Sequence, residues 1–342
     1  MKKFLLVICL AMASAMVVTP AFATEMWDPH LRGVGEGLAA GALPPPGLYF
    51  INDFYFANYH GFGPYFGAAN DGQQASGVKV FAYVDVPVLL WTPGCKLLGA
   101  DYGVAVAQPF DYTHLKIQTP TGFVSGTQLG TFNTILVPYI LSWKLPDDFH
   151  IKTAFEVASD DAMSTPGDRV ASITKHNNFA GSDATGFSDR LNKDDGKVYA
   201  ESGNGFWSFT PTVGISWLHA GWNASAEFFY SFNTKNSATN YQSGDEFAAD
   251  YTLTYTSGKL TVGVGASQEN QVSRDKCDVN DGTGYHGQPG TRAEAYTMGP
   301  ILGYNFGPCS VQFIYNFPIY TNNEVGGGWF NFRLVVPLGK PF

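Results

Sequence analysis

The sequence predicts an all-β fold: an antiparallel transmembrane β-barrel of about twelve strands, with a short plug-like N-terminal segment. Three observations support this fold class. The chain starts with an export signal, its composition is rich in aromatic residues but poor in charge, and segments of alternating polarity recur along it. Together these features are typical of proteins in the outer membrane of Gram-negative bacteria.

Residues 1–23 have the organisation of a secretory signal peptide. Lys2 and Lys3 precede an apolar stretch from Phe4 to Val18, and Ala21-Phe22-Ala23 forms a small-x-small cleavage site. We therefore expect the mature chain to begin near Thr24. No later apolar stretch is long enough to form a membrane-spanning helix, so we expect no helical anchor in the mature protein.

The composition separates this chain from soluble and nucleic-acid-binding proteins. The chain has 20 Lys+Arg and 29 Asp+Glu; removing Lys2 and Lys3 leaves 18 − 29 = −11, so we expect no nucleic-acid partner. Charged residues make up 14% of the chain, whereas a soluble domain has about 25%. Aromatic residues reach 15%. A barrel in lipid combines these traits because only alternate residues face hydrocarbon, whereas a secreted β-sandwich would leave the low charge unexplained.

Alternation of apolar and polar residues predicts the strands. It is clearest in 149–158, 204–217, 222–232 and 246–256, where every second residue is apolar or aromatic. A period of two means a strand with one apolar and one polar face. About ten residues are enough for a tilted strand to cross a membrane.

Twelve such segments occur, and an even number returns both chain ends to the periplasmic side. The predicted strands are 47–58, 76–91, 97–108, 131–143, 149–158, 204–217, 222–232, 246–256, 259–269, 294–305, 309–319 and 328–338. Connections between them alternate between short turns and long loops, the long ones including 109–130, 159–203 and 320–327. Ten or fourteen strands remain alternatives.

The C-terminus carries a further mark of this class. Apolar residues alternate from Phe330 to Leu338, and the chain ends in Phe342. This ending resembles the assembly signal of outer-membrane barrels, although Pro337 lacks the N–H that a ladder needs. The expected partners are therefore outer-membrane lipids and the barrel-assembly machinery.

A specific motif precedes the first strand. A Gly/Ala-rich stretch leads into Gly41-Ala42-Leu43-Pro44-Pro45-Pro46-Gly47, and Leu48-Tyr49-Phe50 follows. Here the sequence resembles the phenol meta-pathway degradation family, also called SphA-like, of outer-membrane β-barrel proteins. The resemblance implies a porin-like channel for passive uptake of small hydrophobic or aromatic compounds.

The residues before the first strand have two interpretations. The Pro44–Pro46 run is a stiff extended spacer without N–H donors, so it could hold residues 24–43 in the lumen as a plug, with Arg32 and Glu36 against the polar wall. Alternatively, the segment hangs in the periplasm and the prolines stop strand pairing. The predicted organisation is a signal peptide (1–23), a Gly/Pro-rich plug or periplasmic segment (24–46) and an outer-membrane barrel (47–342).

The polar face of each strand predicts the lumen lining. The charged residues on it are Asp53, Lys79, Asp85, Asp101, Lys152, Glu156, Glu227, Asp250, Glu269 and Arg333. Seven acids and three bases would favour cations over anions in a conducting lumen. The alternative is that these charges pair with one another and fill a sealed interior. The same alternation turns Phe81, Tyr83 and Phe229 inward.

The sequence predicts no enzyme, and no catalytic, cofactor or metal site. A nucleophile elbow of the Gly-x-Ser-x-Gly type is absent, and the best acid–histidine pair, Asp111 and His114, falls in a predicted loop. The acid-rich stretch 275–282 lacks the closing Glu of a calcium loop. Cys95, Cys277 and Cys309 predict no disulfide framework.

The predicted function is a passive outer-membrane channel whose partner is a small hydrophobic or aromatic solute. The main alternative is a sealed structural barrel that acts through its extracellular loops. The longest loop, 159–203, is either a lid over the pore or a plain surface loop. A hydrolase built on a barrel is the third hypothesis.

Overall fold

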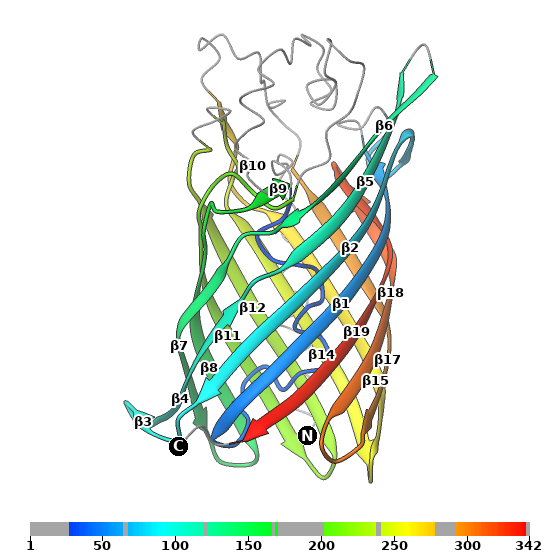
Figure 1. Ribbon diagram of the computed structural model, residues 1–342. Coiled ribbons are helices and arrows are strands. Elements are labelled where there is room, and N and C mark those ends of the chain that lie inside the picture. The colour runs from blue at the N-terminus through cyan, green and yellow to red at the C-terminus, as the bar shows by residue number, and fades with distance from the viewer. Residues whose placement is uncertain are drawn as a thin grey trace.

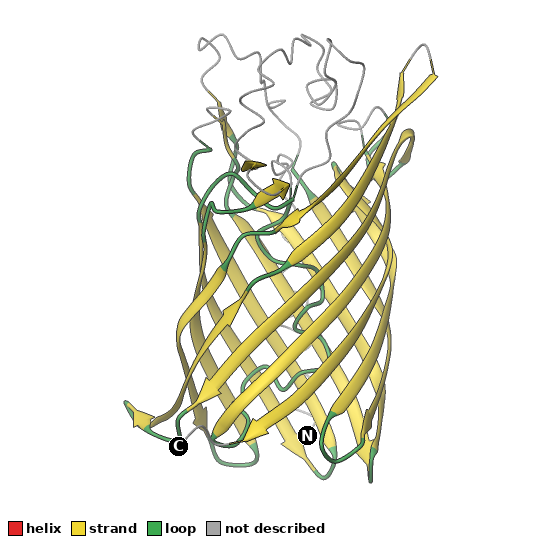
Figure 2. Ribbon diagram, viewed as in Figure 1, coloured by secondary structure: helices red, strands yellow, loops and turns green. Residues whose placement is uncertain are grey.

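The computed structural model describes residues 27–63, 68–119, 122–165, 168–169, 202–236, 241–277 and 292–339, and their strands form a closed barrel (Figure 1). β1 (Gly47–Phe62) pairs antiparallel with β2 (Gln74–Thr92) on one side and with β19 (Glu324–Gly339) on the other. The first and last strands therefore close the sheet. The described residues form strands, turns and loops (Figure 2).

The barrel wall continues from strand to strand with antiparallel neighbours throughout. The uninterrupted strands between β2 and β19 are β8 (Phe149–Ala158), β11 (Ser208–His219), β12 (Trp222–Asn233), β14 (Glu246–Ser257), β15 (Leu260–Gln271), β17 (Glu294–Asn305) and β18 (Ser310–Asn322). The short strands are β3 (Lys96–Leu97), β9 (Met163–Thr165), β10 (Asp168–Arg169), β13 (Tyr241–Gln242) and β16 (Lys276–Cys277).

Two further wall strands are each built from two pieces. The third consists of β4 (Ala100–Ala107) and β5 (Phe110–Thr119), and the fourth of β6 (Gly122–Thr131) and β7 (Ile135–Lys144). Because β2 pairs with both β4 and β5, each broken strand counts as one. The prediction of a twelve-stranded antiparallel barrel is confirmed.

The breaks have a local cause. Pro109 has no N–H for the ladder, and Gln108 bridges the gap by donating to the Phe132 carbonyl at 2.9 Å and accepting from Thr134 Oγ1 at 2.6 Å. Beyond the break, β5 and β6 pair along their whole length, so the prediction of a loop over 109–130 is wrong. The predicted loop over 320–327 is also wrong, because only Asn323 separates β18 from β19.

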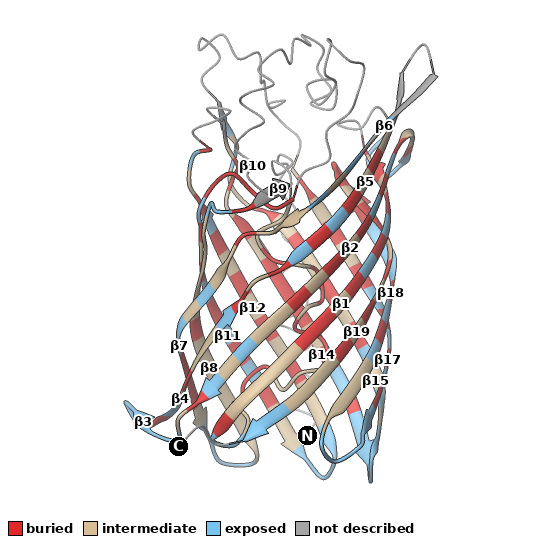
Figure 3. Cartoon of the chain, viewed as in Figure 1, coloured by how far each residue is buried: buried red, intermediate tan, exposed pale blue. Residues whose placement is uncertain are grey.

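The two faces of the wall differ in polarity. Apolar side chains such as Val213, Leu253, Val264 and Leu302 are exposed on the outside, and the residues between them are more buried (Figure 3). Such an apolar outer band is the surface that lipid covers on a transmembrane barrel. In the described part of the chain, no helix has both the length and the apolar character needed to cross a membrane. The predicted signal peptide lies outside the described residues.

Candidate functional site

Residues 27–46, the N-terminal segment, run inside the barrel before β1 begins (dark blue in Figure 1). At one end, the Trp27 N–H donates to Asn204 Oδ1 at 3.0 Å and Asn204 Nδ2 donates back to the Trp27 carbonyl at 2.8 Å. At the other end, Thr92 Oγ1 accepts from the Gly47 N–H at 3.0 Å and donates to the Pro45 carbonyl at 2.8 Å. The segment is thus held to the wall at both ends.

Between its ends, the segment donates its backbone N–H groups to side chains on β11 and β14. The N–H groups of Gly33 and Gly35 both donate to the Asp250 carboxylate, at 3.1 and 2.7 Å. Further along, Gly41 donates to Ser216 Oγ at 2.7 Å. Since a loop in a lumen lacks strand partners, these side chains satisfy backbone groups that would otherwise be buried and unpaired.

Carbonyl groups of the segment accept hydrogen bonds from several wall strands, and Arg333 of β19 supplies two of them. Arg333, fully buried, donates to the Glu36 carbonyl at 2.6 Å and to the Val34 carbonyl, while its Nε donates to Asp53 at 2.8 Å. The Glu36 side chain accepts from Asn316 Nδ2 at 2.6 Å. One guanidinium therefore joins β1, β19 and the segment.

Close approach to the wall explains why the segment is rich in glycine. A Cβ at Gly41 would collide with backbone atoms of β8 and β11, at His150 and Ser216. Gly33 has a φ of 69°, and a Cβ there would meet the Trp329 ring. Residues with side chains do not fit at these two points.

The charged side chains around the segment pair with one another. Arg32 forms ion pairs with Asp28 at 2.8 Å and with Glu269, and donates to the Val325 carbonyl at 2.6 Å. Lys152 Nζ lies 2.6 Å from Glu227. His30 bonds Asp250 at 3.1 Å, and its ring stacks on Phe229 with a centroid distance of 3.8 Å.

A cavity of about 100 Å³ lies between the segment and the wall. Its apolar lining includes Trp27, Tyr55, Val84, Val86, Phe132 and Ile135. His30, Arg32 and Glu156 are among its polar lining residues. The volume is of the same order as the roughly 150 Å³ apolar cavity that holds benzene in an engineered protein.

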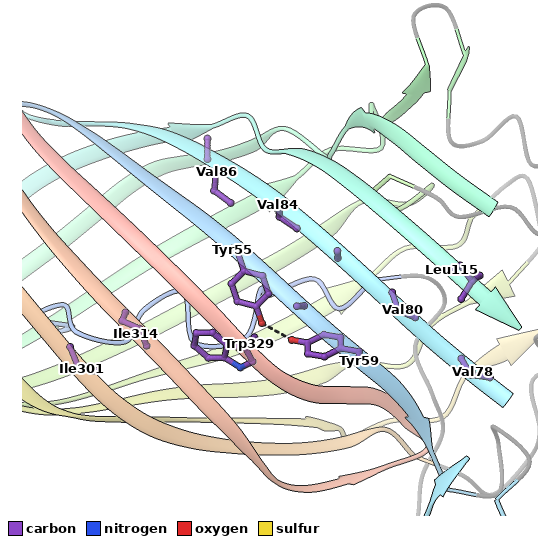
Figure 4. Packing of buried hydrophobic residues seen from close by; sticks show 13 residues of the cluster. Tyr55, Tyr59, Val78, Val80, Val84, Val86, Leu115, Ile301, Ile314 and Trp329 are labelled. Carbon is purple, nitrogen blue, oxygen red and sulfur yellow. Dashed lines mark hydrogen bonds between the residues drawn. The ribbon is translucent and has the colours of Figure 1, made fainter. Parts of the chain in front are cut away.

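The apolar side of this cavity comes from β1 and β2. Tyr55, Val84 and Val86 are buried there in one cluster with Trp329 (Figure 4), and the Tyr55 and Tyr59 hydroxyls lie 2.5 Å apart. Sequence reasoning missed this surface because it assigned the polar face of every strand to the lumen. The available signal was the run of Val and Ala at every second position of residues 78–86.

The predicted lumen residues divide into three groups. Seven lie on the inner face of their strands: Asp53, Lys152, Glu156, Glu227, Asp250, Glu269 and Arg333. Asp101 lies exposed at the end of β4, 3.0 Å from Lys96.

Lys79 and Asp85 correct the prediction for β2. They lie on the face opposite the buried valines, together with Phe81 and Tyr83, and Asp85 accepts from Asn52 Nδ2 at 2.6 Å on that face. The cause is that β2 turns its apolar face inward, whereas the prediction placed the polar face there. Phe229 does face inward, against His30.

The acid–histidine pair considered from the sequence does not form. Asp111 is buried and accepts from Thr113 at 2.7 Å, whereas His114 contacts Thr127 at 2.8 Å from the other face of β5. Among the described residues, no group of three or more His, Cys, Asp or Glu could hold a metal ion. Cys95 and Cys309 are free thiols, and the side chain of Cys277 lies outside the described part.

An exposed titratable pair lies at one end of the barrel, where Asp148 precedes β8 and His219 is the last residue of β11. His219 Nδ1 lies 2.8 Å from Asp148 Oδ2, and this hydrogen bond lowers the pKa of the exposed Asp148 carboxyl. Charge pairs of this kind at an exposed turn contribute little to stability.

Comparison with known proteins tests the predicted family resemblance. The family model described as MetA-pathway of phenol degradation matches residues 188–334, which include β11 to β18 and most of β19. The predicted family resemblance is confirmed. The Gly41–Phe50 motif that first indicated the phenol-degradation family lies outside the matched range.

Solved structures share the architecture at low sequence identity. An outer membrane channel from Pseudomonas putida F1 gives a TM-score of 0.61 at 12% identity, over 87% of this chain and 97% of that one. The translocator domain of the autotransporter NalP from Neisseria meningitidis gives 0.45 at 10% identity, over 87% and 91%. The toluene transporter TodX from Pseudomonas putida gives 0.39 at 9% identity, over 93% and 95%. A search of the curated proteins gave no match. The first likeness shows that the chain has the barrel fold of an outer-membrane channel.

Proposed function

We propose that this protein is an outer-membrane channel of a Gram-negative bacterium that admits small hydrophobic or aromatic solutes by passive diffusion. Residues 1–23 direct export and are removed, residues 24–46 form a plug, and residues 47–342 form the channel wall. The observation that carries the proposal is the largely apolar cavity between the plug and the β1–β2 wall. The fold shared with a solved outer-membrane channel and the family resemblance support it.

The cavity suits apolar solutes for a physical reason. Moving apolar surface out of water is favourable by about 25 cal/mol per Å². Tyr55, Val84 and Val86 offer such a solute contacts inside a lumen whose other walls are polar.

A sealed barrel that acts through its extracellular loops is the second candidate. The ion pairs of Arg32, Lys152 and Arg333 with lumen carboxylates favour this candidate. Charges that pair with one another fill the interior and do not form a path for permeating ions. The two candidates differ in whether removing the plug produces a flux.

The test compares the mature chain with a variant that lacks residues 24–43. We expect small or no currents from the mature chain in planar bilayers and larger stepwise currents from the truncated chain. Uptake of radiolabelled toluene by porin-deficient cells should rise above the empty-vector level with the mature chain. Val264→Leu, a conservative change on the lipid-exposed face, is the matched control and should behave like the unaltered protein. If well-folded barrels gave neither bilayer currents nor toluene uptake, the result would support the sealed alternative.

A further inference from the structure

One inward carboxylate forms no hydrogen bond and no direct ion pair in the described part of the chain. Glu156 lies on the inner face of β8, opposite Thr210 of β11, and lines the cavity. The four other predicted lumen carboxylates on the inner face each bond a neighbouring side chain: Asp53, Glu227, Asp250 and Glu269. Glu156 makes no such bond, so its oxygen atoms are available to a ligand.

The nearby positive groups are already engaged elsewhere. Lys152 binds Glu227 and His30 binds Asp250, while Arg32 is surrounded by Asp28, Glu269 and the Val325 carbonyl. A partly buried carboxylate without a partner is unfavourable and is stabilised by a donor, most strongly by a cationic one. His30 and Lys152 interact with Glu156 electrostatically, but neither donates a hydrogen bond to it among the described residues.

The remainder of the cavity lining adds the second half of a recognition site. Tyr55, Trp27 and Phe132 present aromatic surface to the same space. Aromatic faces attract organic cations through the ring quadrupole, and they also cover the apolar body of such a ligand. The acids Asp28 and Glu324, which also line the cavity, oppose the entry of an anion.

Resting on the proposed channel function, we propose that the cavity is a binding site for small arenes that carry a protonated amine. The ammonium group donates to the Glu156 carboxylate, and the ring lies among the aromatic and valine side chains. Glu156 is thereby the residue that sets specificity: it favours aromatic ammonium ions over neutral arenes of the same size, and it disfavours aromatic carboxylates.

Four probes of similar size and different charge test this site. Benzylamine, benzyl alcohol, toluene and benzoate are titrated by calorimetry into the intact protein, purified from outer membranes in detergent, at mildly alkaline pH. A charge-assisted hydrogen bond is worth about 1.5 kcal/mol or more, so benzylammonium should bind roughly tenfold tighter than toluene. Benzyl alcohol should fall between them, and benzoate should bind most weakly.

Two variants assign the effect to Glu156. Glu156→Gln keeps the size of the side chain but removes its charge, so benzylammonium should bind no better than benzyl alcohol while toluene binding is unchanged. Asp101→Asn, which removes one negative charge at the exposed end of β4, is the matched control and should keep the tenfold preference. Retention of the preference by E156Q would overturn the assignment.

The outcomes separate this inference from the proposed function. If toluene binds but benzylammonium binds no tighter, the ammonium site is wrong and the channel proposal is unaffected. If no probe binds, both fail. If E156Q fails to insert into the outer membrane, the order of affinities of the four probes for the unaltered protein still decides the proposal.

Discussion

Two walls of the same lumen treat the N-terminal segment differently. On β11 and β14, the side chains Ser216 and Asp250 accept hydrogen bonds from its backbone. On the facing wall, Val84 and Val86 offer none, and the cavity opens there. Both walls obey the same alternation along their strands, but one turns its polar face inward and the other its apolar face. The segment is therefore hydrogen-bonded to the wall along much of its length but not at Val84 and Val86, and the cavity lies at that gap.

The largest effect should come from breaking the polar wall at Asp250. Asp250→Ala removes the acceptor for Gly33, Gly35 and His30, and loss of one member of a buried charged network costs about 3–5 kcal/mol. We expect the segment to leave the lumen, which exposes Arg32 to trypsin and raises the conductance. Mass spectrometry of limited digests detects cleavage after Arg32. Asp101→Asn is the control, and an uncut Arg32 in D250A would contradict the role of this wall.

A steric change in the segment itself should act next most strongly. Gly41→Leu places a side chain against the backbone at His150 and Ser216, and overpacking costs about 1–3 kcal/mol. The same digest should show partial cleavage after Arg32. Val264→Leu, on the lipid-exposed face, should leave the digest unchanged. Equal protection in both variants would mean that close packing at Gly41 is dispensable.

Filling the apolar wall should affect transport without releasing the segment. Val84→Phe enlarges a side chain that lines the cavity, so toluene uptake should fall roughly tenfold for a steric cost of about 1.4 kcal/mol. Trypsin should still fail to cut after Arg32. Val264→Phe, the same kind of enlargement on the lipid-exposed face, should retain uptake. Unaltered uptake in V84F would show that solutes do not use the cavity.

The smallest effect is expected for the exposed pair of Asp148 and His219 at the end of the barrel. Because the pKa of Asp148 is lowered by its bond to His219, its contribution to stability is present above the unfolded-state pKa of aspartate, about 3.9, and is lost as pH falls through the lower folded-state pKa. Asp148→Asn should therefore lower the unfolding temperature slightly at neutral pH and not at all in strong acid. A difference that persists in acid would contradict this pH dependence.

The sequence allowed the strands to be predicted well where one face of the wall is clearly polar. The predicted strands at 149–158 and 294–305 have the same bounds as β8 and β17. Along β2, the alternation of residues located the strand but did not tell which face points inward. The polar face was expected to line the lumen, whereas the buried face of β2 is apolar. The breaks near Pro109 could not be predicted, since they depend on bonds from Gln108 to a strand paired through folding.

The site was only partly accessible from the sequence. The inward charges of β8, β12, β14, β15 and β19 follow from period two, and the interpretation of Arg32 and Glu36 as groups that meet a polar wall agrees with their bonds to Glu269 and Asn316. The cavity was not predictable, because its lining joins Trp27, Tyr55, Val84 and Phe132, which are brought together only when the barrel closes. That Glu156 forms no hydrogen bond was likewise not predictable, because it depends on which carboxylates the neighbouring cationic side chains bind.

Arg333 joins the last strand to the first strand and to the N-terminal segment. Its guanidinium bonds Asp53 on the first strand and the carbonyls of Val34 and Glu36, although it belongs to the last strand to be synthesised. Asp53 lies directly opposite Arg333 across the seam between β1 and β19. One side chain therefore ties together the two edges of the sheet and the chain that runs between them, so the closure of the barrel and the position of its N-terminal residues depend on the same guanidinium.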